Sequence, residues 1–235
     1  MKGNLFIIPI PISNRNAESV LGEHTIDIAK KLRYFVVEKT KTARQFLRKV
    51  DRTFPIDDSV FYELNKHHSY EFNQDVIRYL ESGEDVGVMS EAGYPGIADP
   101  GNTVVQLAHS KGIKVIPLYG PSSLFLAMAS SGLNGQGFTF HGYLPKSESE
   151  RISAIKQLSQ QVAQTGFAQI FIETPYRNQA IYESLLKHTS SELKLNIAMD
   201  ITGDKEFIKT KTIRDWKKTN LSFDKAPCVF ILGQF

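Results

Sequence analysis

Apolar runs of strand length alternate with helical patterns along the first half of the chain. The runs are almost continuously apolar, as expected for parallel strands buried on both faces, and they cover residues 5–10, 34–38, 85–90 and 114–118. Between them, EFNQDVIRYLES carries apolar side chains at helical spacing, and NTVVQLAHSKG does the same before a glycine ends the helix. This alternation predicts βαβ units and a mostly parallel sheet.

A new pattern begins after YGPSS (119–123). The segment SLFLAMASSGL predicts a helix, and the polar break NGQG follows it. Beyond the break, the predicted strands cover 138–145, 168–173, 195–201, 207–212 and 228–232, and the predicted helices lie near 152–162 and at 179–188. The sequence therefore predicts an α/β protein with two lobes, residues 1–120 and 121–235, the first with a mostly parallel sheet and the second with a mixed sheet.

Composition narrows the class of protein. The chain has 235 residues, 41% hydrophobic and 23% charged, and its formal net charge of +3 is too small to indicate a nucleic-acid partner by itself. Cys228 is the single cysteine, which excludes an intramolecular disulfide and a zinc site built on cysteine pairs. Pro9 and Pro11 interrupt the first apolar run, and no apolar stretch approaches the roughly 20 residues of a membrane span. We expect a cytoplasmic protein.

The loop SEAGYPGIADPG (90–101) follows a predicted buried strand and combines three glycines, two prolines and two carboxylates. Glycine lacks a Cβ and proline fixes φ, so such a loop suits a ligand that lies against the backbone. Ligands of parallel sheets bind outside the carboxyl ends of the strands, where PIPISN, EKTK, YGPSS and ETPYRN also fall. Each of these alone is typical of an ordinary turn, but together they predict a binding site for a polar small molecule.

Several catalytic patterns are missing from the sequence. The first predicted strand is followed by no glycine-rich dinucleotide fingerprint, and there is no G-x-S-x-G nucleophile elbow. His67 and His68 lie in a polar stretch typical of solvated surface. His141, in FTFHGY, is expected to be a half-buried strand residue rather than a ligand.

The segments LFIIPIPISN, SEAGYPGIADPG and VIPLYGPSS, in this order and spacing, resemble the tetrapyrrole methylase family of S-adenosylmethionine-dependent methyltransferases. Within the family, the segment SEAGYPGIADPG resembles the corresponding loop of the branch that methylates ribose 2′-hydroxyls of small-subunit ribosomal RNA. GYLP (142–145) and the acidic element from Glu173 to Arg177 resemble the same branch. The resemblance covers nearly the whole chain. It implies a homodimer of bilobed α/β chains, with S-adenosylmethionine in the cleft between the lobes.

The resemblance also implies which residues hold the cofactor. In the first lobe these are Ile12, Gly93, Tyr94, Pro95, Ser122 and Ser123. The three residues of the long loop would meet the methionine portion, and the two serines would bind through backbone and hydroxyl groups. In the second lobe, the positions implied to surround the adenosine are Glu173, Thr174, Thr210, Ala226 and Pro227.

Methyl transfer from a sulfonium is an in-line displacement, so the protein mainly aligns the nucleophile and no metal is required. A carboxylate within hydrogen-bond reach could take the proton of a ribose hydroxyl, and Glu38 and Glu91 are the candidate bases. The alternative for both is strand-end solvation or a salt bridge to Lys39 or Lys41. Asp99 either joins Glu91 in a negative field that suits the sulfonium or forms a local turn.

Some residues of this chain differ from those usual in the RNA-methylating branch, and the differences bear on the identity of the methyl acceptor. The second predicted strand ends in Glu-Lys-Thr-Lys where the branch usually has Glu-Asp-Thr-Arg, and Glu91 and Tyr94 stand where the branch has Asp and Thr. These differences are compatible with a different or narrower substrate.

Basic side chains cluster in residues 39–52, six against one acidic, and in residues 205–218, six against two. Neutralisation of phosphates by such clusters favours RNA, whereas a solvated helix face is the more common reason for a basic run. Three hypotheses follow. The protein is a methyltransferase of ribosomal RNA ribose, a methyltransferase of a small molecule such as a tetrapyrrole, or a non-catalytic cofactor- or RNA-binding protein.

Overall fold

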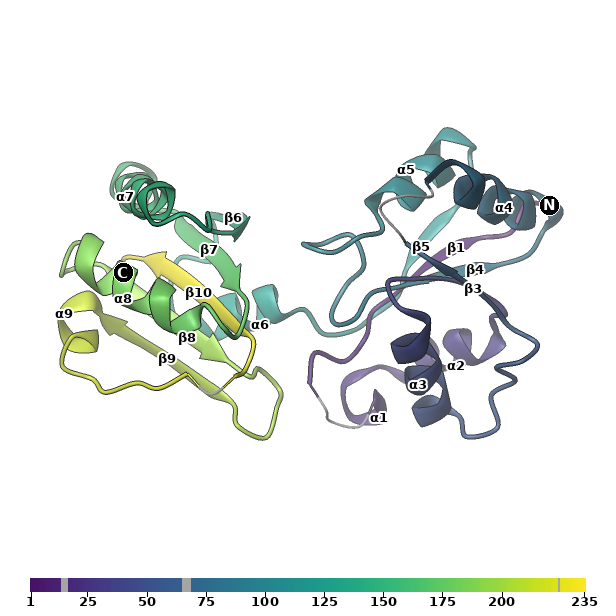
Figure 1. Cartoon of the computed structure of the whole chain (residues 1–235), viewed down its shortest axis with the longest axis horizontal. Coiled ribbons are helices and arrows are strands. Elements are labelled where there is room, and N and C mark those ends of the chain that lie inside the picture. Colours follow the sequence, from purple (N-terminus) through teal and green to yellow (C-terminus); the bar gives the residue numbers. More distant parts are fainter. Residues whose placement is uncertain (14–16, 65–68, 224) are drawn as a thin grey trace. The chain divides into compact units, whose positions relative to one another are not determined.

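The computed structural model describes residues 1–13, 17–64, 69–223 and 225–235 (Figure 1). The chain divides into two compact units, Met1–Ser122 and Ser123–Phe235, and each unit has its own five-stranded sheet. The histidine pair at 67–68 lies outside the described residues. Within the described parts, no helix is both long and apolar enough to cross a membrane.

The first sheet is entirely parallel. Its strands are β1 (Leu5–Ile8), β2 (Tyr34–Val37), β3 (Val60–Glu63), β4 (Val86–Met89) and β5 (Val115–Pro117). They lie in the order β3-β2-β4-β1-β5. Since all strands run the same way, their carboxyl ends meet at one edge of the sheet. The loop 90–101 leaves that edge between the exits of β1 and β2.

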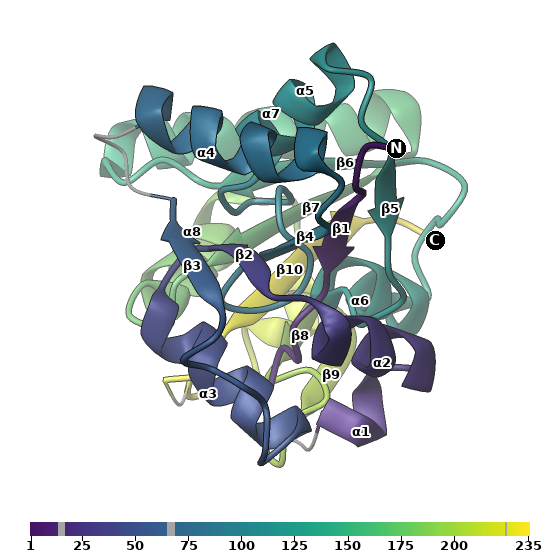
Figure 2. The same ribbon diagram turned by 90° about the vertical axis from the view of Figure 1, so that its right-hand side faces the viewer.

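Helices cover both faces of the first sheet. Figure 2 shows α1 (Ala17–Val20), α2 (Glu23–Lys31) and α3 (Thr40–Val50) on one face, and α4 (Ser69–Ser82) and α5 (Asn102–Ser110) on the other. Successive side chains of a strand point to opposite faces. Accordingly, Phe6 and Ile8 join the core beside α2 and α3, whereas Leu5 and Ile7 join the core beside α4 and α5. This two-sided burial explains why the strand is continuously apolar.

The second sheet is mixed. Its strands are β6 (Phe138–Tyr143), β7 (Ala168–Glu173), β8 (Lys194–Met199), β9 (Phe207–Thr212) and β10 (Cys228–Gly233), in the order β6-β7-β10-β8-β9. β6 and β7 pair in parallel, and the other three pairings are antiparallel. The α/β class, with one parallel and one mixed sheet, confirms the predicted fold class.

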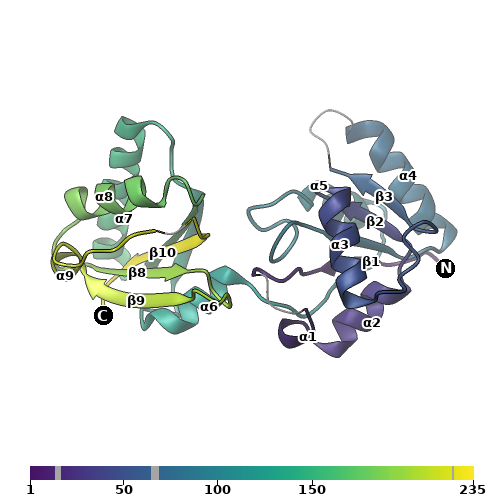
Figure 3. The same ribbon diagram turned by 60° about the horizontal axis from the view of Figure 1, so that its bottom comes forward.

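Figure 3 shows α7 (Glu148–Thr165) and α8 (Asn178–His188) on one face of the second sheet and α6 (Ser123–Ser131) on the other. The short helix α9 (Ile213–Trp216) follows β9. Both ends of α7 are capped. The Ser147 hydroxyl accepts a hydrogen bond from the Glu150 backbone N–H and donates one to the Glu150 carboxylate, and Gly166 ends the helix at φ 70°. These caps position the helix beside β6.

Candidate functional site

The loop 90–101 is tied to the exit of β1 through Gly93. Gly93 and Ile10 exchange two backbone hydrogen bonds, each 2.9 Å long. Gly93 has φ +70°, a conformation that side-chain-bearing residues rarely adopt. A Cβ at this position would lie 3.5 Å from Ile12 Cγ2, so the predicted cofactor residues Gly93 and Ile12 are neighbours. Because the Gly93 amide and carbonyl are already bonded, a ligand would meet its α-carbon.

Tyr94 ties the same loop to the exit of β5. Its hydroxyl donates a hydrogen bond to the Leu118 carbonyl and accepts one from the Gly120 N–H, each 3.0 Å long. The hydroxyl is therefore engaged within the protein, and the adjacent Pro95 is buried. Ser122, a predicted cofactor residue, ends the segment 118–122, which is hydrogen-bonded to the Tyr94 hydroxyl. Ser123, the other predicted serine, begins α6.

Three carboxylates gather between the exits of β2 and β4. Glu38 follows β2, and its Oε2 accepts a hydrogen bond of 3.3 Å from the Glu91 N–H. The Glu91 carboxylate accepts from the Thr42 hydroxyl and lies 3.2 Å from Lys39 Nζ. The salt bridge to Lys39, left open as an alternative from the sequence, is thus present for Glu91.

Asp99 is the third carboxylate of this group. Burial and the negative charges of Glu38 and Glu91 raise the pKa of Asp99 to about 6, although a hydrogen bond from the Ser90 side chain acts in the opposite direction. Asp99 therefore belongs to an acidic cluster and is more than a turn former. A group with a pKa of about 6 can exchange a proton near neutral pH.

In the second unit, four of the five predicted residues lie at one edge of the sheet. Glu173 ends β7 and pairs with Cys228 at the start of β10, so Ala226 and Pro227 directly precede that pairing. Oε1 of Glu173 accepts hydrogen bonds from the Thr174 N–H (2.7 Å) and hydroxyl (3.2 Å). These contacts order the turn that leaves β7.

Arg177 joins the two motifs that resemble the RNA-modifying branch. Its Nη2 donates hydrogen bonds to the carbonyls of Leu144 (3.1 Å) and Pro145 (2.9 Å), both in GYLP. The same nitrogen lies 3.1 Å from Glu173 Oε2, but that oxygen receives no hydrogen bond from the described residues, so the two groups interact by charge alone. Glu173 is buried, and the ion pair compensates part of its desolvation.

Asn178, the first residue of α8, adds another acceptor atom at this edge. It is fully buried, and its Nδ2 donates a hydrogen bond of 2.8 Å to the Ala226 carbonyl. The buried Asn178 Oδ1 has no hydrogen-bond partner among the described residues. Sequence reasoning missed Asn178, because no local pattern distinguishes a buried asparagine at a helix start from a solvated one.

Thr210 stands apart from the other predicted adenosine residues. It lies within the edge strand β9, where it pairs with Asn196 of β8, three residues in from the edge that carries Glu173. The Thr210 hydroxyl donates to the Ser131 carbonyl (2.6 Å) and accepts from Asn196 Nδ2 (2.9 Å). Both hydrogen bonds hold α6 and β8 against β9, which is sufficient reason for a threonine here.

Comparisons with known proteins identify the family of the chain. Residues 4–216 match the family described as Tetrapyrrole (Corrin/Porphyrin) Methylases. Ribosomal RNA small subunit methyltransferase I of Vibrio cholerae is 29% identical over 205 residues, which cover 87% of this chain and 67% of that protein. The protein of the same name from Buchnera aphidicola subsp. Schizaphis graminum is 27% identical over 237 residues, covering 99% of this chain and 79% of that protein.

Solved structures show the same fold at low sequence identity. The methyltransferase CobJ matches with a TM-score of 0.64 at 15% identity, covering 99% of this chain and 94% of that chain. The uroporphyrin III C-methyl transferase from Thermus thermophilus matches with a TM-score of 0.59 at 14% identity, covering 98% of this chain and 97% of that chain. Since the family match spans most of its length, the chain belongs to the tetrapyrrole (corrin/porphyrin) methylase family and is a methyltransferase.

Proposed function

We propose that this chain transfers a methyl group from S-adenosylmethionine to a ribose 2′-hydroxyl of small-subunit ribosomal RNA. The observation that carries the proposal is the acidic cluster of Glu38, Glu91 and Asp99 at the carboxyl edge of a parallel sheet, beside a loop that is bonded to both neighbouring strand exits. The names of the relatives from Vibrio cholerae and Buchnera aphidicola support RNA as the acceptor.

Each unit, taken by itself, has residues that suit a part of S-adenosylmethionine. When bound, this cofactor supplies a methyl group on a positively charged sulfur. In the first unit, Glu38, Glu91 and Asp99 provide the negative charge that suits such a cation. In the second unit, Asn178 Oδ1 and Glu173 Oε2 are buried acceptors that receive no hydrogen bond from the described residues, although Glu173 Oε2 is ion-paired with Arg177. Both atoms suit N–H donors such as the adenine amino group.

Within the acidic cluster, Asp99 is the best placed to take the proton of the acceptor hydroxyl. Glu91 is paired with Lys39 and Thr42, and Glu38 accepts the Glu91 N–H, so both are held by other groups. The pKa of Asp99, raised to about 6, is matched to proton transfer near neutral pH. A catalytic role for Glu38 and Glu91, as predicted from the sequence, stays a prediction.

The exposed face of α3 supplies positive charge for RNA phosphates. Ala43, Phe46, Leu47 and Val50 are buried on one side of the helix. The opposite side exposes Lys41, Arg44, Arg48 and Lys49. These basic side chains share one face, which suits a polyanion, and α3 begins directly after Lys39, which reaches the acidic cluster.

The second basic run has a structural explanation. Lys209 and Lys211 lie on the edge strand β9, where lysines prevent strand pairing between molecules. Lys211 also donates a hydrogen bond of 2.7 Å to the Thr219 hydroxyl, and Arg214 pairs with Glu192. We therefore assign RNA binding to α3.

The proposal is tested by methyl transfer from radiolabelled S-adenosylmethionine to three acceptors: intact small ribosomal subunits, deproteinised small-subunit RNA and a tetrapyrrole. We expect label in RNA, in a nucleotide that resists alkaline cleavage because its 2′-oxygen is methylated. Label in the tetrapyrrole alone would establish the small-molecule alternative. Cofactor or RNA binding without transfer to any acceptor would establish the non-catalytic alternative.

Charge reversal on α3 tests the RNA surface separately. Lys41→Glu combined with Lys49→Glu should weaken RNA binding and reduce the dependence of affinity on salt, because fewer phosphate counterions are released. Lys111→Glu combined with Lys114→Glu, two exposed positions at the opposite ends of the strands, is the matched control and should leave both unchanged. Affinity for S-adenosylmethionine should be the same in all three proteins.

We also propose that the protein acts as a cytoplasmic homodimer. Exposed apolar side chains on neighbouring elements support a contact with a second copy, since Phe125 of α6 and Phe138 of β6 are 59% and 38% exposed and their rings pack edge to face. Sedimentation at micromolar concentration should give twice the chain mass of 26.5 kDa. A species of 26.5 kDa at that concentration would contradict the dimer.

A further inference from the structure

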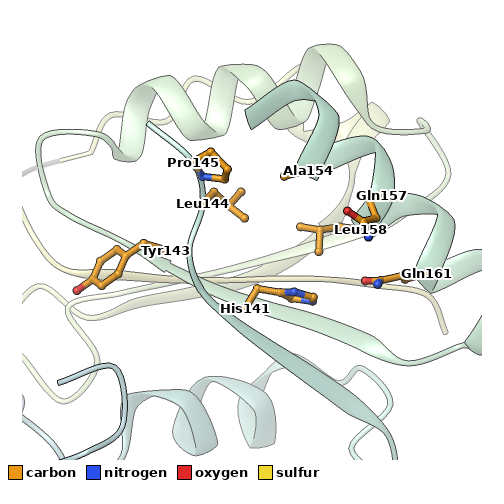
Figure 4. Close-up of a pocket in the computed structure, with 8 residues that line it drawn as sticks. All are labelled: His141, Tyr143, Leu144, Pro145, Ala154, Gln157, Leu158 and Gln161. Carbon is orange, nitrogen blue, oxygen red and sulfur yellow. The ribbon is translucent and has the colours of Figure 1, made fainter. Parts of the chain in front are cut away.

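A cavity of about 190 Å³ lies between β6 and α7 in the second unit (Figure 4). Leu144, Pro145, Ala154 and Leu158 form its apolar lining, and the remaining lining residues are His141, Tyr143, Gln157 and Gln161. A cavity of about 150 Å³ holds a benzene ring, so this one has room for a six-membered ring with exocyclic groups. Nothing in the proposed handling of S-adenosylmethionine uses it.

His141 presents a hydrogen-bond acceptor in the cavity lining. Its Nε2 lies 2.7 Å from Oε1 of the buried Gln169, whose Nε2 in turn donates a hydrogen bond of 2.8 Å to the Phe167 carbonyl. The Phe167 carbonyl can only accept, so it fixes the orientation of the Gln169 amide. His141 Nε2 must therefore carry the proton, and in the neutral ring Nδ1 keeps a lone pair for an N–H donor.

Gln161 presents a second acceptor. Its Oε1 is buried and has no hydrogen-bond partner among the described residues. Figure 4 shows the amide end of Gln161 directed from α7 toward the His141 ring. A buried acceptor without a partner destabilises the folded protein, so its presence in a cavity wall points to a ligand that completes the bond.

The cavity is connected to the predicted cofactor edge through Arg177. The carbonyls of Leu144 and Pro145, two lining residues, accept the hydrogen bonds of Arg177, and this guanidinium also faces Glu173. β6 and β7 run in parallel, and the lining residues Tyr143, Leu144 and Pro145 lie at the carboxyl end of β6, beside the end of β7. A nucleotide held here would have its base next to residues expected to hold the cofactor.

We propose that this cavity receives an unstacked nucleobase of the RNA acceptor and recognises an amino group on its Watson–Crick edge. This inference rests on the proposed function, since RNA is its source of the base. Single-stranded RNA is commonly read by hydrogen bonds to such edges together with apolar packing of the ring. Adenine, cytosine and guanine carry an exocyclic amino group whose two N–H bonds can be donated to two acceptors, whereas uracil has no amino group and offers a single ring N–H between two carbonyl oxygens.

The first test measures binding of the four nucleoside monophosphates to the full chain. Binding is detected through changes in the NMR signals of the His141 ring. We expect AMP, CMP and GMP to shift these signals at millimolar concentration, and UMP to bind about tenfold more weakly. Gln161→Leu should remove the difference between the nucleotides. Gln160→Leu, an exposed position on the same helix, is the matched control and should preserve it.

The second test measures methylation kinetics on RNA. Gln161→Leu should raise KM for RNA about tenfold while affinity for S-adenosylmethionine is unchanged, and Ala154→Met, which fills the cavity, should do the same. Gln161→Leu should also keep or raise the melting temperature, because it removes an unpaired buried acceptor. If one of these two variants fails to fold, the KM of the other still tests the proposal.

The outcomes separate this inference from the proposed function. If the protein methylates RNA but both variants keep the wild-type KM and no nucleotide shifts the His141 signals, the base site is refuted and the activity stands. Equal binding of UMP and CMP likewise refutes amino-group recognition. If RNA is not methylated but AMP, CMP and GMP still bind selectively at His141, the proposed activity is refuted and the base site stands.

Discussion

Replacing Tyr94 by phenylalanine removes one oxygen atom that joins two strand exits. The Tyr94 hydroxyl bonds both the carbonyl of Leu118 and the N–H of Gly120, at 3.0 Å each. The ring keeps its place beside the apolar core below α4 and α5 in the variant. The perturbation is therefore confined to two hydrogen bonds between the loop 90–101 and the segment 118–122.

The expected cost follows from these two bonds. Leu118 is buried, so its carbonyl is left without solvent when the hydroxyl is removed, whereas Gly120 is half-buried and its N–H regains water more easily. A hydrogen bond of this kind contributes roughly 0.5–1.5 kcal/mol, and leaving a buried partner unpaired costs about 1–3 kcal/mol. We expect Tyr94→Phe to lower the free energy of unfolding by about 2 kcal/mol.

Urea unfolding followed by circular dichroism measures this loss, and hydrogen exchange locates it. Exchange should become faster at residues 90–101 and 118–122 together, because one hydroxyl holds both segments. Tyr119→Phe is the matched control, since Tyr119 is 81% exposed and the same chemical change there should cost nothing. Unchanged stability and unchanged exchange in Tyr94→Phe would show that the hydroxyl does not join the two exits.

Three further substitutions test the rest of the site. Gly93→Val should abolish S-adenosylmethionine binding measured by calorimetry. Because Gly93 has φ +70°, the substitution should also lower the free energy of unfolding by about 2 kcal/mol without unfolding the protein. Gly135→Val, in an open loop, is the control and should preserve binding. Because the pKa of Asp99 is raised to about 6, the folded protein binds an extra proton between about pH 4 and pH 6, so stability falls as pH rises through that range. Asp99→Asn should remove this slope and raise stability at pH 7 by about 1 kcal/mol, discounted for partial exposure, in urea titrations at several pH values. Arg177→Met should cost about 3 kcal/mol by leaving Glu173 buried without its counter-charge, and adding Glu173→Gln should recover most of that loss in the same assay.

Much of the fold could be predicted because burial on both faces leaves a clear trace in a strand. β1, β2 and β4 are almost fully buried and read as nearly continuous apolar runs, from which each was predicted. β5 was predicted from the same pattern, although at the edge of the sheet its residues are partly buried or exposed. β3 was missed, since its four residues are only partly covered at the edge of the sheet and its aromatic side chains follow no simple alternation. α3 was not predicted as a helix, although its buried positions have helical spacing, because its basic residues dominate the local composition.

The candidate site could be predicted less fully, because hydrogen-bond partners far apart in sequence determine what each residue does. Gly93 could be recognised as special from the loop, but its bonds to Ile10 could not. Thr210 has the residue type expected near a ligand, yet its hydroxyl joins β8, β9 and α6. The single side-chain acceptor atom of Asn178, Oδ1, could not be identified from the sequence, because the hydrogen bond of Nδ2 to the distant Ala226 carbonyl orients the amide.

Charge balance accounts for the way the acidic cluster would act in methyl transfer. Glu38, Glu91 and Asp99 place three carboxylates together, and Lys39 neutralises one of them. Two negative charges then favour a bound cation, and that cation would lower the pKa of Asp99 toward its ordinary range. In the proposed reaction Asp99 would take the proton of the acceptor hydroxyl, and its affinity for that proton would be higher when no cation lies beside the three carboxylates. Under the proposed function, the same cluster would therefore both hold the charged cofactor and accept the proton of the acceptor hydroxyl.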